Sequence, residues 1–251
     1  MRMRRSAFGS LLILFAAAGA WSAPPSRGVM TAWNVEAAEP RPEPFQVGPN
    51  DYVIRQRLLP MGLAELAGAA PGLGAMTAGK QLIELQGGGA AIFCDPVIRA
   101  KKLLGHAQLC LMDMDRNGRF EAYFETSSVT KGIVTIQGSR PKRPTALEPV
   151  AYRRIDPRQF DQQLFLGVQY RGNANIFGNF VFEIRYGSEG NMGSLTRRIL
   201  HKKANVPGST DVLGGRFSIL EAGSGGIKVR IDSPLPPQPF GVLQTTNYRI
   251  Y

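Results

Sequence analysis

Five oxygen donors fall close together between Asp113 and Glu121. They are the side chains of Asp113, Asp115, Asn117 and Glu121 and the backbone carbonyl of Arg119, at alternate positions of the segment DMDRNGRFE. Carboxylate and carbonyl oxygens are the ligands that calcium prefers. Asp and Asn also close loops by bonding to their own backbone, without any ion. Two interpretations therefore stand side by side, a calcium site and a structural loop.

The spacing of these donors resembles the first nine positions of the EF-hand calcium loop, in which glycine at the sixth position, here Gly118, allows the turn. The twelfth position departs from the pattern. Phe124 stands where the EF-hand has a bidentate glutamate, and Glu125 comes one residue late. The flanking residues alternate with period two, as in strands. The resemblance therefore concerns one loop and no EF-hand fold, and it favours the structural loop over calcium.

Alternation on both sides predicts a β-hairpin with a six-residue loop over 113–118. Met112 then lies opposite Arg119, and Leu111 lies opposite Phe120. One face of this hairpin collects the apolar residues Ala107, Leu109, Leu111, Phe120, Ala122 and Phe124.

Basic residues are concentrated in three further segments, SRPKRP, YRRIDPR and TRRILHKK. If these segments converge, they form an anion-binding face, and the candidate residues are Arg153, Arg154, Arg197, Arg198, Lys202 and Lys203. Lipid phosphates, acidic polysaccharide or an acidic envelope protein would be attracted to such a face. The alternative is a set of separate solvated patches.

The first 23 residues have the layout of a secretory signal peptide. Arg2, Arg4 and Arg5 precede an apolar run at 11–20, and small residues offer cleavage after Ala20 or Ala23. These three arginines carry 3 of the formal charge of +11, so the mature chain keeps +8. We expect a periplasmic, cell-surface or secreted protein with no transmembrane segment after cleavage. Export argues against a nucleic acid partner.

Cys94 and Cys110 are the two cysteines of the chain. In the oxidising compartment that the signal peptide implies, a disulfide between them forms and persists. A zinc site is a poor alternative, because the two histidines do not have metal-ligand spacing.

Short apolar clusters separated by glycine and proline predict a mainly β chain, an antiparallel sandwich or open barrel with one or two short helices. Strands are expected at 163–170 and 179–187, and a hairpin is expected at 216–232. Helical turns are expected in 59–70 and 95–107, the second begun by Asp95 and Pro96.

The segment 24–50 contains six prolines and is expected to be a flexible or extended arm, in which Trp33 is the residue able to dock. An N-terminal β unit over 51–138 and a C-terminal β unit over 150–251 follow, either separate or forming one continuous domain. The proline-containing segment 139–149 is the expected boundary.

Together these features lead to three functional hypotheses. The first is a non-enzymatic envelope binding or assembly module that holds an anionic envelope component. The second is a calcium-stabilised structural or adhesive β domain, and the third is an enzyme for which no catalytic residue or cofactor can be named.

Overall fold

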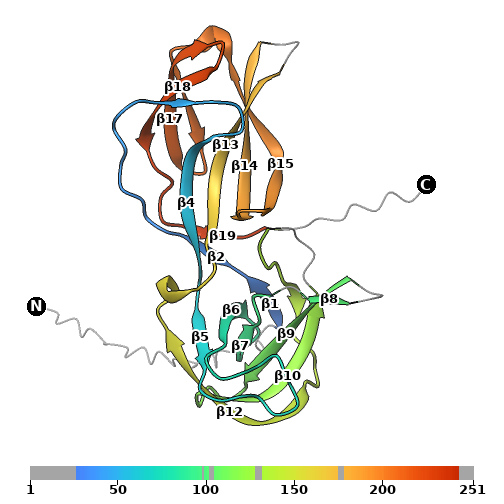
Figure 1. Cartoon of the computed structure of the whole chain (residues 1–251). Coiled ribbons are helices and arrows are strands. Elements are labelled where there is room, and N and C mark those ends of the chain that lie inside the picture. The colour runs from blue at the N-terminus through green and yellow to red at the C-terminus, as the bar shows by residue number, and fades with distance from the viewer. Residues whose placement is uncertain (1–26, 98, 102–104, 128–131, 175–177, 243–251) are drawn as a thin grey trace, which may run out of the picture.

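The computed structural model describes residues 27–97, 99–101, 105–127, 132–174 and 178–242, which form a closed barrel and a half-barrel (Figure 1). The predicted signal peptide and its two cleavage positions lie outside these residues. None of the helices in the described ranges is long and apolar enough to span a bilayer.

The barrel is closed because β6 pairs with both β5 and β7. Its six strands are β5 (Leu63–Leu66), β6 (Gln81–Gly87), β7 (Ala91–Cys94), β9 (Gly105–Asp113), β10 (Arg119–Ser127) and β12 (Thr145–Ile155). Three short strands add to its sheet: β1 (Gly28–Thr31) on β6, β11 (Gln137–Ser139) on β1, and β8 (Arg99–Lys101) on β9.

The half-barrel consists of two sheets whose inner faces share one core. The first runs in the order β15 (Asn191–Lys202), β14 (Asn179–Ser188), β13 (Leu164–Ala174), β4 (Tyr52–Pro60), β2 (Trp33–Val35) and β19 (Pro239–Phe240). The second runs in the order β16 (Gly208–Val212), β17 (Gly215–Gly223), β18 (Gly226–Ser233) and β3 (Phe45–Val47). Two 3-10 turns, η1 (Pro157–Gln159) and η2 (Lys203–Asn205), complete the described elements.

Two apolar clusters hold these parts together. One is built from barrel strands and the loop after β5, and it includes Phe93, Leu111 and Phe120, which fill the barrel. The other covers the outside of the barrel and continues between the half-barrel sheets, with Trp33 only 1% exposed. Several barrel strands are therefore buried on both faces.

The mainly β prediction is confirmed, and every described strand pairing is antiparallel. The expected strands at 163–170 and 179–187 are neighbours, β13 and β14, and the expected hairpin at 216–232 is β17 and β18. The disulfide is also confirmed, since Cys94 and Cys110 are bonded and lie opposite each other on β7 and β9.

The expectation of helical turns at 59–70 and 95–107 is wrong. The first segment holds the end of β4 and all of β5, and the second holds β8 and the start of β9. Leu63, Ala64 and Leu66 are all buried, because this strand is covered on both faces. Consecutive buried residues hide the period of two and imitate the spacing of a helix.

Of the two forms expected for the arm at 24–50, flexible or extended, the described residues 27–50 contain extended strands. β1, β2 and β3 each pair with a strand from elsewhere in the chain. The four described prolines, at 40, 42, 44 and 49, lie outside these three strands, so no ladder hydrogen bond is lost to them. Val29, Trp33, Val35 and Val47 supply the buried side chains that hold the segment.

The two predicted β units exchange strands across the boundary at 139–149. β12 begins inside that segment and pairs with β5 and β10 of the barrel. β4, from the N-terminal half, pairs with β13 of the half-barrel. Pairing between strands distant in the chain, and not chain order, defines the two parts.

Candidate functional site

The carboxylate of Asp113 lies at the end of β9 and is completely buried. It accepts hydrogen bonds from the backbone N–H of Asn117 at 3.1 Å and of Gly118 at 2.9 Å, and from the Tyr152 hydroxyl at 2.8 Å. Three donors thus satisfy this buried charge from within the chain. Asp113 closes the loop that follows it.

Asp115 and Asn117 bond mainly to each other and to their own backbone. The Asp115 carboxylate accepts from the backbone N–H of Asn117 at 3.2 Å and from its side-chain amide at 2.9 Å. The Asn117 carbonyl oxygen accepts from the backbone N–H of Arg119 at 2.9 Å. These are the local bonds by which Asp and Asn stabilise turns.

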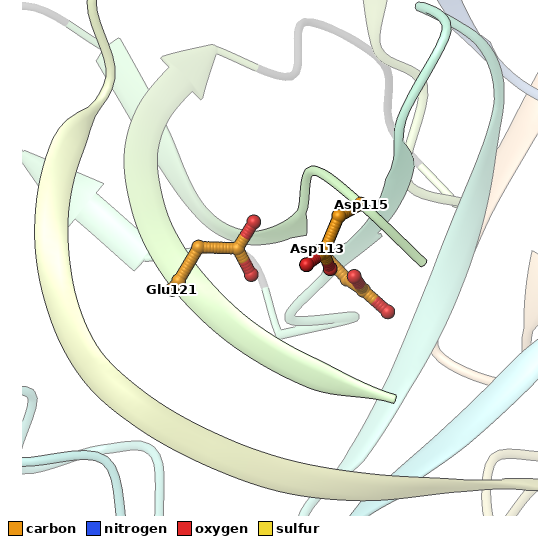
Figure 2. Close-up of side chains that lie close together, drawn as sticks. All are labelled: Asp113, Asp115 and Glu121. Atoms are coloured by element: carbon orange, nitrogen blue, oxygen red, sulfur yellow. The ribbon is translucent and has the colours of Figure 1, made fainter. Parts of the chain in front are cut away.

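Glu121 reaches back over the same loop from β10, with its side chain directed toward Asp113 (Figure 2). One of its carboxylate oxygens accepts from the backbone N–H of Met114, and the other is buried without a hydrogen bond among the described residues. Asp113, Asp115 and Glu121 each offer an oxygen within 4.8 Å of the other two. Three of the five predicted calcium ligands therefore meet.

Calcium would have to replace donors on the oxygens of Asp113, Asp115 and Asn117, whereas one oxygen of Glu121 has no hydrogen bond among the described residues. The Asn117 oxygen is taken by Arg119, and Arg119 itself pairs with Ala151 of β12. Calcium requires six to eight oxygens, whereas the three carboxylates supply only part of that number. The geometry favours a structural loop, in which most of the acidic and amide oxygens accept hydrogen bonds from N–H groups of the loop itself.

The predicted hairpin register is wrong, because Met112 pairs with Ala122 and not with Arg119. β10 shifts register between Phe120 and Ala122, where Glu121 stands, since its first residues pair with β12 in a different frame. The shift turns Phe120 into the barrel, whereas Ala122 and Phe124 join the outer cluster. This local irregularity in the ladder places Phe120 and Ala122, two residues apart, on opposite sides of the sheet.

Tyr152 connects the loop to the interior of the barrel. Its ring stacks on Phe120 with centroids 4.1 Å apart, and it lies 5.3 Å from the ring of Phe93. Burial, and then the hydrogen bond to Asp113, raise the pKa of the Tyr152 hydroxyl to about 12. The hydroxyl therefore remains protonated and donates a hydrogen bond to the Asp113 carboxylate.

The two candidate basic residues that lie on β12 form ion pairs with glutamates of other barrel strands. Arg153 pairs with Glu65 at 2.8 Å, and Arg154 forms a bidentate pair with Glu84 at 2.8 and 2.7 Å. The hydrogen bonds that Arg154 donates to the Glu84 carboxylate raise the pKa of Arg154. Each arginine has its own glutamate, so this pair leaves little surplus charge.

The other predicted basic residues lie on the half-barrel, away from β12 (Figure 1). Arg198 and Lys202 belong to β15, and Lys203 begins η2 with its ammonium group 5.6 Å from the centroid of the Phe180 ring. The side chain of Arg197 lies outside the described part of the structure. The basic residues therefore do not form the single face that convergence would have produced.

Arg198 instead belongs to a cluster that sequence reasoning missed. The Glu183 carboxylate lies 3.3 Å from Arg198, 3.4 Å from Arg171 and 3.9 Å from Arg185. These side chains come from β15, β13 and β14. Three guanidinium groups thus share one carboxylate, and the Nε of Arg185 is buried without a described partner.

Arg55 extends this cluster across β4. It pairs with Glu189 at 2.8 Å and covers the ring of Phe165 at 3.8 Å. Gly167 of β13 lies between Arg55 and Arg185 in the ladder. We call Arg55, Arg171, Arg185 and Arg198 the arginine face; with Glu183 and Glu189 it holds four positive and two negative charges.

A signal for this face was present in the sequence. Glu183 and Arg185 alternate with buried residues of β14, and Arg171 has the same outward phase on β13. The register of the neighbouring strands was needed to bring them together.

No known protein family, no curated protein and no solved structure matches this chain. The functional argument therefore depends on geometry and charge.

Proposed function

We propose that this protein is an exported, non-enzymatic module of the cell envelope that holds an anionic envelope component on its arginine face. The observation that carries the proposal is the sharing of one glutamate, Glu183, by three arginines of adjacent strands. Acidic groups supplied by a ligand would offset the two surplus positive charges of the arginine face. Lipid phosphate and the carboxylates of an acidic polysaccharide both have that chemistry.

Exposure of the guanidinium groups supports a role in binding. The side chains of Arg55, Arg171 and Arg198 are 46%, 39% and 67% exposed, so a ligand can reach them from solvent. Their strands are held by a continuous ladder from β4 to β15. A rigid sheet fixes the spacing of the charges and limits the side-chain entropy lost on binding.

Export is supported by two independent features. The N-terminal residues have signal-peptide layout, and the buried disulfide between Cys94 and Cys110 is of a kind that persists in oxidising compartments.

The test is co-sedimentation with vesicles of phosphatidylglycerol and of phosphatidylcholine, and retention on immobilised polygalacturonate, over a range of salt concentrations. We expect salt-sensitive binding to one or both anionic materials and none to phosphatidylcholine. The variant Arg171→Gln/Arg198→Gln should bind roughly thirtyfold more weakly, since each basic residue near an anionic surface contributes about 1 kcal/mol.

The matched control is Arg153→Gln/Arg230→Gln, which removes the same charge from residues paired with Glu65 and Asp232. It should retain most of the binding. Equal losses in the two variants would mean that only net charge matters, and the proposed face would be wrong.

A further inference from the structure

A pocket of about 640 Å³ lies beside the arginine face, at the end of the sheet where β13 begins and β14 ends. The described residues that line it are Arg55, Gln162, Gln163, Ser188 and Glu189. All five are polar or charged, so we call this site the polar pocket. The acyl chains of a lipid would find no apolar side chain among these five.

The charges at the rim of the polar pocket balance each other. Arg55 donates a hydrogen bond of 2.8 Å to the Glu189 carboxylate, and the two side chains are 46% and 78% exposed. The guanidinium group also covers the ring of Phe165, which holds it at the rim. An anion entering the pocket would meet Glu189 as well as Arg55. A neutral polar group therefore fits the pocket better than a phosphate does.

The other lining side chains supply hydrogen-bonding groups without charge. Gln162 and Ser188 are half-buried, and Gln163 is exposed. In the described part of the chain, no hydrogen bond joins these three side chains to another residue. An amide carries both donors and an acceptor, and a hydroxyl acts as either. Sugar hydroxyl groups also donate and accept, so they match this lining.

The polar pocket lies at one end of the arginine face. Ser188 closes β14, and Glu183, which three arginines share, stands five residues earlier on the same strand, about 17 Å away at about 3.3 Å per residue. Arg55 connects the two ends, because it lines the pocket and lies in one cross-strand row with Gly167 and Arg185. A single phosphate group cannot reach both ends, whereas a linear polymer can.

We propose that the ligand of the arginine face is an acidic polysaccharide and not a lipid phosphate, and that the polar pocket binds hydroxyl groups of its sugar units. This assignment rests on the proposed function. Carboxylates of the polysaccharide pair with Arg171 and Arg198, and hydroxyls further along the same polymer bond to Gln163 and Ser188. The arginines supply the attraction, and the neutral groups supply selectivity among polyanions.

The test uses the full chain and the variant Gln163→Ala/Ser188→Ala, which removes two neutral groups and leaves the net charge unchanged. Retention on polygalacturonate should weaken about tenfold through two lost hydrogen bonds, without a change in its salt dependence. Retention on polyglutamate, which carries carboxylates but no hydroxyl groups, should be the same for the variant and the wild type.

The matched control is Gln137→Ala/Ser139→Ala, which removes the same two groups from exposed positions of β11 on the barrel. It should bind polygalacturonate as the wild type does. Equal losses in the two variants, or no loss in Gln163→Ala/Ser188→Ala, would overturn the assignment. Binding to phosphatidylglycerol vesicles and not to polygalacturonate would overturn it while leaving the proposed function intact. Binding to neither material would overturn both.

Discussion

The acidic loop after β9 and the arginine face of the half-barrel each hold side chains of like charge close together. In the loop, Asp113 alone receives three hydrogen bonds from within the chain, and Asp115 receives two. On the arginine face, three guanidinium groups share the single carboxylate of Glu183, and Arg171 also donates to the neutral side chains of Asn50 and Gln169. The first cluster supplies its own partners, whereas the second has a surplus of donors.

This difference shows that residue composition does not distinguish a ligand site from a structural turn. Calcium binds carboxylate and amide oxygens, but backbone N–H groups donate hydrogen bonds to the same oxygens. The supply of internal partners decides between the two roles. On that criterion the basic cluster is the better candidate for external recognition.

The largest expected effect is that of Asp113→Ala. It should lower the free energy of unfolding by about 3 kcal/mol, because two backbone N–H groups and the Tyr152 hydroxyl lose a buried charged acceptor. Urea denaturation measures it. Asp115→Ala, at an exposed position, should lower stability by about 1 kcal/mol or less; equal effects would contradict the central role of Asp113.

Glu183→Gln should lower stability by about 2 kcal/mol at low ionic strength, because three arginines lose their shared carboxylate in a half-buried setting. Phosphate or sulfate should recover part of the loss by screening and binding. Glu65→Gln, which affects a single pair with Arg153, should lower stability by less than about 1 kcal/mol. A loss at Glu183 that is insensitive to salt would argue against electrostatic crowding.

Tyr152→Phe should lower stability by about 1.5 kcal/mol at neutral pH, through the lost hydrogen bond to Asp113. The raised pKa of Tyr152, about 12 against 10.0, adds a pH dependence. The native state holds this proton more tightly than the unfolded state, so the contribution is complete below about pH 10 and is lost as pH rises toward about 12. Denaturation of both proteins between about pH 9 and 11.5 should show a steeper decline for the wild type.

The smallest expected effect is that of calcium. Millimolar calcium and a chelator should give melting temperatures within about 1 °C of each other, because the oxygens of Asp113, Asp115 and Asn117 already accept hydrogen bonds. A rise of several degrees with calcium, abolished by both Asp115→Ala and Glu121→Gln, would establish the metal site and reverse the comparison.

Local alternation predicted the β class, the neighbouring strands β13 and β14, and the hairpin of β17 and β18. The large apolar residues of these elements recur at every second position, so their pattern is visible in a short segment. The loop bonds of Asp115 and Asn117 span two residues and were equally accessible to sequence reasoning.

Prediction failed where burial came from distant segments. A helical turn was predicted at 59–70 because both faces of β5 are covered, which hides the alternation of a strand. Residues 27–50 were predicted to be part of an arm because their partner strands lie far along the chain. The hairpin register changed because β10 also pairs with β12.

The amino-acid sequence by itself determined the strand pairs β13–β14 and β17–β18, the disulfide partners and the local bonds of Asp115 and Asn117, since each depends on short-range pattern or on having two cysteines. Tertiary structure alone decided the arginine face. That face requires side chains from separate strands to meet in one register. That register is set by long-range pairing and shared burial, which no local segment contains.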